Sequence, residues 1–228
     1  MRLPVALCLL LIPGAVAASE GIDHAYHAGH DMAEDPVVAM LMVDRLEAGR
    51  QNQLTAGAWD ARAWIGTDQS RWQLRSEGHD AGSGHSADTT LEVSWLRPVS
   101  PWIQLAVGAV RDVQGGLSRN GVAAGLVGVL PYRVNLQSAV WLTGGSHAAV
   151  RIELEQDWLL TQRWVLQPRL ESRLWSSGER SADVGLRLRY EIRRELAPYV
   201  GVNYAFSRDI SRSEAGGTQV VAGLRAWF

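Results

Sequence analysis

Three histidines near the N-terminus are spaced so that they could hold a metal ion together. His24, His27 and His30 fall within seven residues of a chain that has six histidines, and Met32 follows them. Imidazole binds copper, zinc and nickel, and the soft thioether of methionine favours Cu(I). The spacing matches no closed structural site, and residues 19–36 have no helical or strand period. We therefore expect a disordered tail that traps metal with modest affinity; a solvated tail with incidental histidines is the alternative.

Two further methionines, Met40 and Met42, lie at the start of the part of the chain in which apolar and polar residues alternate. Alternate residues of a strand share a face, so both sulfurs lie on one face together with Asp44. If that face lines an interior, the sulfurs are thioethers that Cu(I) would accept. If it faces outward, they are ordinary apolar side chains. The charge of Asp44 favours the interior, so both methionines are candidate metal ligands.

Acidic and arginine side chains recur throughout the rest of the chain, within apparent strand segments. Charges at membrane depth are tolerated when they face a protein interior and pair with one another. We therefore expect an ion-pair network that fills a small barrel and leaves little open channel. The functional alternative is a polar path for a cation. Its carboxylates would be Asp44, Asp60, Glu77, Glu153, Glu171 and Glu191.

Other side chains give weaker signals of chemistry. His79, His85 and His147 fall in predicted loops or strand ends. Ser146 beside His147, with Thr143 nearby, is the one local arrangement suited to a hydrolase, but no acid is placed to orient the imidazole. We therefore predict no enzymatic activity. The net charge of -2 gives no reason to expect a nucleic-acid partner.

Strands must position these residues. Between Val184 and Ile192 apolar side chains alternate with Arg187, Arg189 and Glu191, and successive side chains of a strand point to opposite faces. Several other segments of roughly 10 residues repeat the pattern, which is the signature of a transmembrane barrel. Hydrophobic residues make up 46% of the chain, yet the mean hydropathy is -0.08, which argues against a helical membrane protein.

A soluble sandwich could show the same alternation, but four observations favour an outer-membrane barrel. The N-terminus resembles a secretory signal, and no helix-period segment is present to cover a sheet. The chain also stops on an apolar-alternating strand that ends at Phe228. Finally, aromatic residues fall near segment ends, where girdles at the two membrane interfaces would lie. These residues are Trp64, Trp102, Tyr132, Trp158, Trp164 and Tyr199.

The composition divides the chain into three parts. Residues 1–18 form a signal peptide, with Arg2 before an apolar run and small residues at the cleavage site. The single cysteine, Cys8, lies within it, so the mature chain has no disulfide. Residues 19–36 form the His-rich tail. Residues 37–228 form the transmembrane β-barrel and contain all 10 tryptophans.

We predict about 12 antiparallel strands, an even number as in single-chain bacterial barrels. Their centres are Met42, Ala61, Leu74, Val93, Val107, Leu126, Leu136, Ile152, Leu170, Leu188, Val202 and Leu224. If the second of these segments belongs to the first strand and one other segment is not a strand, the barrel has about ten strands. Residues 97–101 and 130–131 read as short periplasmic turns. Residues 78–87, 113–119 and 207–217 read as longer outside loops.

Several runs of residues resemble the copper resistance protein B family. They are Asp35-Pro36, Met40, Met42, Asp44-Arg45-Leu46-Glu47, Trp59-Asp60-Ala61, Ala63-Trp64-Ile65-Gly66, Leu159-Leu160-Thr161-Gln162-Arg163, Leu166-Gln167-Pro168-Arg169-Leu170-Glu171, Gly185 to Glu195, and Ala197-Pro198-Tyr199-Val200-Gly201-Val202. The resemblance covers residues 35–228. It implies an outer-membrane barrel of a periplasmic copper resistance system, preceded by a His/Met-rich segment that binds copper.

The resemblance also implies partners and ligands. The protein would act alongside a periplasmic multicopper oxidase and other periplasmic copper proteins. Carried over by position, the copper-handling residues are His24, His27, His30, Met32, Met40 and Met42. Family members often carry a longer Met/His-rich stretch, so we expect a lower copper capacity here. We predict an outer-membrane copper-binding protein that sequesters copper or assists its export. The alternative is a passive or structural barrel with an incidental His tail.

Overall fold

The computed structural model describes residues 35–51, 54–80, 88–114, 116–144, 147–209 and 212–228. The predicted signal peptide, and the tail ligands His24, His27, His30 and Met32, lie outside the described residues. From Asp35 onward the chain forms one compact unit. No α-helix in the described ranges is long and apolar enough to cross a membrane.

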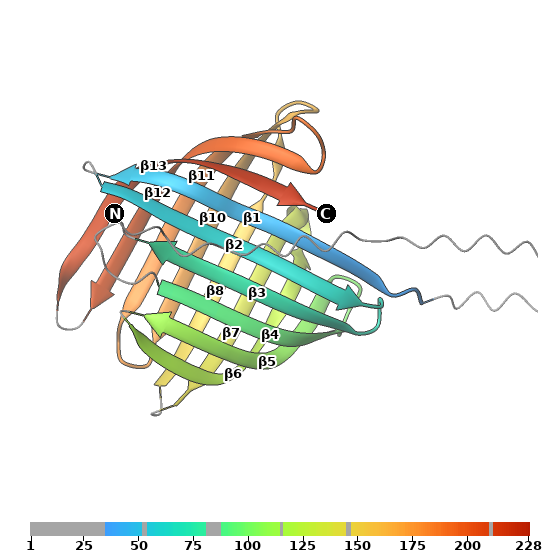
Figure 1. The fold of residues 1–228 in the computed structure, drawn as a ribbon, viewed down its shortest axis with the longest axis horizontal. Coiled ribbons are helices and arrows are strands. Elements are labelled where there is room, and N and C mark those ends of the chain that lie inside the picture. The colour runs from blue at the N-terminus through green and yellow to red at the C-terminus, as the bar shows by residue number, and fades with distance from the viewer. Residues whose placement is uncertain (1–34, 52–53, 81–87, 115, 145–146, 210–211) are drawn as a thin grey trace, which may run out of the picture. The chain divides into compact units, whose positions relative to one another are not determined.

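Antiparallel strands follow one another around a closed β-barrel (Figure 1). They are β1 (Val38–Gln51), β2 (Leu54–Gly66), β3 (Arg71–Asp80), β4 (Asp88–Pro98), β5 (Ile103–Gln114), β6 (Leu117–Leu130), β7 (Val134–Thr143), β8 (His147–Gln156), β9 (Trp158–Leu159), β10 (Trp164–Trp175), β11 (Arg180–Tyr190), β12 (Leu196–Asp209) and β13 (Arg212–Trp227). The first and last strands pair with each other, with Met42 opposite Trp227. Closure leaves no sheet edge with unpaired backbone groups, which lipid cannot satisfy.

Strands β8 and β9 are two parts of one barrel strand, interrupted at Asp157. Both pair with β10, through Glu155 opposite Arg169 and Leu159 opposite Val165. The barrel therefore has the predicted 12 strands, and every predicted strand centre falls inside a separate strand. The alternative of ten strands, with the first two merged, is wrong.

The two faces of the wall differ in character as the alternation predicts. Outward-facing Leu186 is 47% exposed, whereas its neighbour in sequence Arg187 is 3% exposed. The same contrast holds between Ile152, at 44%, and Glu153, at 2%. The barrel thus presents an apolar band to lipid and encloses its charges, the arrangement that membrane barrels require.

One inner wall is apolar rather than charged. Val110, Ala123, Trp141, Ala149 and Trp175 pack together inside the barrel. The two indole rings are 6.1 Å apart between centroids. An arginine of β10, Arg173, lies 5.2 Å from the centre of the Trp141 ring, at cation–π distance. Small side chains on this wall make room for the long arginines that fill the interior.

The links between strands agree with the predictions at one mouth of the barrel and differ at the other. At the terminal mouth, where β1 begins and β13 ends, β4 and β5 are joined by residues 99–102, and β6 and β7 by Pro131–Arg133. These are the predicted short turns. At the opposite, distal mouth the predicted loops 113–119 and 207–217 are wrong. There, β5 runs to Gln114 and β12 to Asp209 before β6 and β13 begin at Leu117 and Arg212.

The physical reason is that these polar, glycine-containing segments extend the strands beyond the apolar band. Backbone pairing continues there, with Asp112 opposite Arg119 and Gln114 opposite Leu117. Gly116 adopts φ +82°, a conformation that turns the chain sharply and that side chains with a Cβ rarely adopt. In the third predicted loop, 78–87, β3 continues to Asp80, and residues 81–87 lie outside the described ranges.

The aromatic girdle forms at the terminal mouth. Trp102, Tyr132, Trp158 and Trp164 are all exposed there, at 70%, 89%, 48% and 41%. Their amphipathic rings suit the boundary between lipid and water. Two of the predicted girdle residues point elsewhere.

Tyr199 and Trp64 face the barrel interior, which corrects their predicted place in the girdle. Tyr199 is 6% exposed and donates a 3.0 Å hydrogen bond to Glu47. Trp64 lines an internal cavity, and the Arg71 guanidinium lies 4.6 Å from its ring centre. Both sit near strand ends, as predicted, but strand parity decides the face, and here it places them inside.

An arginine at Leu170 should lower the free energy of unfolding by about 2–4 kcal/mol, because a charged side chain would have to enter the hydrocarbon. Leu170 is 43% exposed on the outer face of β10, between Leu154 and Val184 of the flanking strands. Denaturant titration of the barrel in lipid vesicles, followed by tryptophan fluorescence, measures the change.

Ile65→Arg serves as the matched control, because Ile65 is also apolar and is 54% exposed on the outer face, but it lies at the terminal end of β2. Near the interface the same substitution should cost about 0–1 kcal/mol. Equal losses for the two variants would contradict an apolar band centred on the middle of β10.

Candidate functional site

A β-bulge in β1 brings an unusual number of chemically active side chains into the barrel. The register with β2 slips between Val43, opposite Ala61, and Arg45, opposite Asp60, so Asp44 is the extra residue. A bulge places two residues against one and changes strand parity. Asp44 and Arg45 consequently both reach the interior, whereas Leu46 is 49% exposed outside.

The bulge leaves Met42 on the inner face. Its sulfur lies 3.8 Å from Arg62 Nη2 and 3.9 Å from Arg225 Nη2. Asp44 pairs with both guanidinium groups, accepting from Arg62 Nε at 2.6 Å and lying 3.4 Å from Arg225 Nη2. Met40 and Met42 line one small cavity of about 290 Å³ at the terminal mouth. The structure therefore brings the two predicted methionines together, next to a group of charges in which arginines outnumber carboxylates.

The middle of the barrel is filled by an ion-pair network centred on Glu153. This carboxylate is 2% exposed and lies 2.9 Å from Arg75, 2.6 Å from Arg151 and 2.8 Å from Arg169. Arg75 also pairs with Asp60 at 2.6 Å. Strands β2, β3, β8 and β10 supply these groups, so the network links opposite walls.

A second shared carboxylate, Glu77, extends the network toward the distal mouth. It lies 2.9 Å from Arg151, 3.4 Å from Arg173 and 3.8 Å from Arg45. Glu171 in turn joins Arg151 at 3.0 Å to Arg169 at 2.6 Å. Each carboxylate is shared between several guanidinium groups, so no single pair can separate without disturbing its neighbours.

Arginine alone supplies the side-chain cations of this chain. All 22 of its Lys and Arg residues are arginine. The planar guanidinium offers five donors and is more weakly hydrated than an ammonium group. It can therefore bridge two or three carboxylates in a dry interior where a lysine would leave some of them unsatisfied.

The predicted polar path is therefore a paired network rather than a row of free carboxylates. Asp44, Asp60, Glu77, Glu153 and Glu171 all face the interior, and each forms at least one ion pair. Glu191 lies apart from them at the terminal mouth, where its side chain is 30% exposed and 3.5 Å from Arg189. Among the described residues, a cavity of about 480 Å³ lies on the distal side of the network, and cavities of about 600 and 290 Å³ lie on its terminal side.

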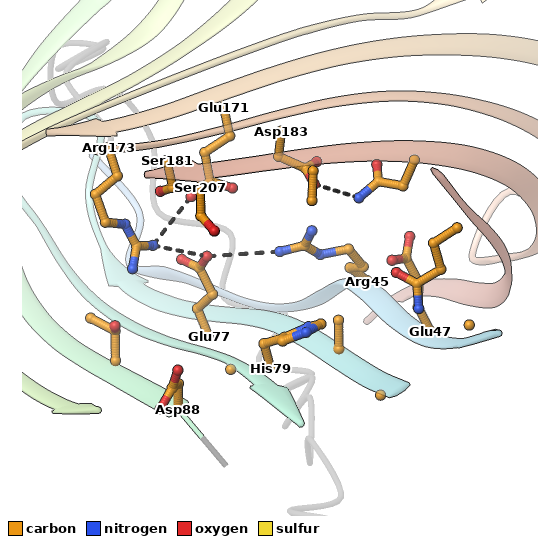
Figure 2. A pocket seen from close by; sticks show the side chains of 18 of the residues that line it. Arg45, Glu47, Glu77, His79, Asp88, Glu171, Arg173, Ser181, Asp183 and Ser207 are labelled. Carbon is orange, nitrogen blue, oxygen red and sulfur yellow. Dashed lines mark hydrogen bonds and ion pairs between the residues drawn. The ribbon is translucent and has the colours of Figure 1, made fainter. Parts of the chain in front are cut away.

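The histidines divide between the two mouths and the part of the chain outside the described residues. His79 lines the distal cavity (Figure 2). His147 begins β8 and is exposed, whereas His85 and Ser146 lie outside the described residues. Within the described ranges no three His, Cys, Asp or Glu side chains converge to hold a metal ion directly.

Sequence reasoning missed Arg45 and Arg225 as partners of the candidate residues. Arg45 reaches the interior because of the bulge, which the alternation alone does not reveal. Arg225 lies on the last strand and meets Asp44 through barrel closure. A break in the alternation at Asp44-Arg45 is the one sequence signal that could have indicated the first.

A family model and two relatives match nearly the whole barrel. The family model described as Copper resistance protein B precursor (CopB) matches residues 37–228. Copper resistance protein B of Escherichia coli is 33% identical over 216 residues, which covers 88% of this chain and 73% of that protein. The Copper resistance protein B homolog of Pseudomonas syringae pv. tomato (strain ATCC BAA-871 / DC3000) is 31% identical over 233 residues, covering 95% and 79%.

Among solved structures, the NanC porin superposes with a TM-score of 0.55 over 82% of this chain and 98% of the porin. Its sequence is 10% identical, so the likeness concerns the fold alone. It places the closed barrel among outer-membrane porin folds.

Glu153→Gln should lower the free energy of unfolding by about 3–5 kcal/mol, because three buried guanidinium groups would lose their shared counter-charge. Glutamine keeps the size of the side chain, so the loss reports on charge rather than on packing. Denaturant titration of the barrel in vesicles measures it.

Glu191→Gln is the control, since its carboxylate is partly solvated and makes one 3.5 Å contact. A loss of about 1 kcal/mol or less is expected there. If Glu153→Gln proved as mild as Glu191→Gln, the network would not hold the barrel together.

Proposed function

Because the chain belongs to the copper resistance protein B family, we propose that it binds copper ions at the terminal mouth of its barrel, and thereby sequesters copper or assists its export. The barrel lies in the outer membrane, and its role is in copper resistance. The proposed activity is ion binding, and it requires no catalytic step.

The pair Met40 and Met42 carries this proposal. Both line the small cavity at the terminal mouth, and thioether sulfur is a ligand that Cu(I) prefers over hard cations. The charges that line this cavity are the carboxylates of Asp157 and Glu191 and the guanidinium groups of Arg189, Arg194 and Arg225. A soft cation held by sulfur depends less on net charge than a hard one does, so the cavity suits Cu(I) at modest affinity.

The length of the intervening chain limits how far the tail ligands can lie from this cavity. Met40 follows Met32 by eight positions, and an extended chain spans at most about 3.6 Å per position, or roughly 29 Å in all. Short tethers hold a second ligand group at high effective concentration. We therefore propose that His24, His27, His30 and Met32 capture copper and exchange it with Met40 and Met42.

The closed network supports sequestration at the mouth over free passage. A cation moving from the terminal to the distal cavity would have to displace Arg75 or Arg169 from Glu153. Export would therefore need the network to rearrange. If the terminal mouth faces the periplasm, periplasmic copper proteins are the proposed partners, among them a multicopper oxidase.

A passive barrel with an incidental tail is the second candidate. The observation that favours it is that the carboxylates of the predicted path are paired with arginines, which suits a purely structural interior. Copper binding and copper tolerance separate the two candidates.

Deleting residues 19–34 should remove most Cu(II) binding and weaken Cu(I) binding, because imidazole accepts both oxidation states. The double variant Met40→Leu, Met42→Leu should weaken Cu(I) binding by about tenfold or more while sparing Cu(II). Leucine and methionine exchange with little cost in packing. Metal titration of the folded, detergent-solubilised protein under reducing and oxidising conditions measures both effects.

The deletion stops at residue 34 so that β1 stays intact and Asp35 Oδ1 keeps its 3.0 Å hydrogen bond from the Asp68 amide. His147→Gln, at the distal mouth, is the matched control and should change neither titration. Unchanged copper binding in both test variants would leave the passive barrel as the better account.

A strain lacking the protein should become more sensitive to copper, and full-length protein should restore tolerance. The variant without residues 19–34, expressed at the same level in the outer membrane, should restore it only in part. Growth over a copper concentration series measures this. Full rescue by the truncated variant would show that the tail contributes nothing.

A further inference from the structure

The distal cavity is strongly acidic, unlike the terminal cavities. Its charged lining consists of six carboxylates and two guanidinium groups, with His79 beside them. The carboxylates belong to Glu47, Glu77, Asp88, Asp112, Glu171 and Asp183, and the guanidinium groups to Arg45 and Arg173. In Figure 2, Glu77 and Glu171 are seen with Arg45 and Arg173 around one shared space.

Most of these carboxylates are neutralised by arginines that lie behind the cavity wall. Glu47 pairs with Arg187 at 2.6 Å, and Glu171 pairs with Arg151 at 3.0 Å. Such groups already have their counter-charge. The acidity of the lining therefore does not by itself make a cation site.

Asp112 differs from them because one of its oxygens has no partner. Its Oδ1 accepts a 2.9 Å hydrogen bond from Thr90 Oγ1, whereas its Oδ2 has no hydrogen-bond partner. The residue is 1% exposed. Arg119, opposite it in the strand register, and Arg173 attract its charge, but within the described part of the chain neither forms an ion pair with it. A buried carboxylate oxygen without a hydrogen bond is costly when the group is ionised, because it has lost its hydration and the bond on the other oxygen replaces only part of it.

The strand register places a second carboxylate in the same row. Glu77 lies opposite Thr90, and Thr90 lies opposite Asp112, so the three inward side chains stand side by side on β3, β4 and β5. Thr90 orients Asp112 through its hydrogen bond. Glu77, although paired with arginines, adds negative potential to the same part of the cavity.

We propose that the distal cavity binds a hydrated divalent cation of the oxygen-preferring class, with Asp112 Oδ2 as its one direct protein ligand. Carboxylate oxygen suits hard divalent cations, and the smaller of these keep several of their waters when a protein supplies few ligands. No three acidic or histidine side chains in the described ranges converge on one point, so water must complete the coordination shell. A volume of about 480 Å³ has room for it, since each water takes up about 30 Å³.

The site lies on the far side of the ion-pair network from Met40 and Met42. Its ligand is a hard carboxylate oxygen, whereas the methionine sulfurs are soft ligands. It therefore goes beyond the proposed copper site and does not depend on it. A barrel that failed to bind copper could still bind a divalent cation here.

Mn²⁺ binding to the full-length, folded protein tests this inference, with free Mn²⁺ followed by electron paramagnetic resonance. Asp112→Asn should weaken the tightest site by about tenfold or more, because it removes a direct ligand. Asparagine keeps the shape of the side chain and its hydrogen bond from Thr90. Asp68→Asn, in an exposed turn at the terminal mouth, is the matched control and should leave binding unchanged.

A second measurement uses the wild-type protein and so does not rely on the variant folding. Bound Mn²⁺ should broaden the amide resonances of Thr90 and Asp112 before those of β1 near Met42. Equal Mn²⁺ binding by Asp112→Asn and wild type, absence of binding, or broadening confined to the terminal mouth or the tail would each overturn the proposal. Loss of copper binding with Mn²⁺ binding retained would count against the proposed function alone.

Discussion

The barrel depends on keeping its charges inside a closed wall and pairing them there. Lipid can satisfy neither a backbone amide nor a guanidinium group, so the sheet has to close and its charged face has to turn inward. Glu153 shows how the second requirement is met, since it lies within 3 Å of Arg75, Arg151 and Arg169, which come from three different regions of the chain. The network also ties opposite walls together across an interior that lacks a large apolar core.

The same network determines where function can reside. Because the central carboxylates are occupied by arginines, they are poor ligands for a passing metal ion. The chemistry is left to the two mouths. At the terminal mouth the available ligands are the thioethers of Met40 and Met42, and at the distal mouth they are the oxygens around Asp112. In the proposed scheme, the barrel therefore separates a soft site from a hard one, with the paired charges between them.

The bulge at Asp44 connects the network to the terminal mouth. It lets one strand contribute Met42, Asp44, Arg45 and Glu47 to the interior within six residues. Without it, Arg45 and Glu47 would face lipid. Their partners would also change, because Glu47 meets Arg187 and Tyr199 only through the closure of the barrel. A local irregularity is therefore what couples the candidate copper ligands to the rest of the fold.

The strands and the general division of their faces could be predicted from the sequence. The alternation around Arg187 and Arg189, and the twelve strand centres, were predictable because a strand exposes every second side chain to the same surroundings. The exceptions to this pattern could not be predicted in this way. Whether Tyr199 and Trp64 face lipid or the interior, and whether residues 113–119 form a loop or extend two strands, depends on pairing with neighbouring strands. The contacts of Glu153 likewise depend on which walls meet across the barrel, a property that no single segment encodes.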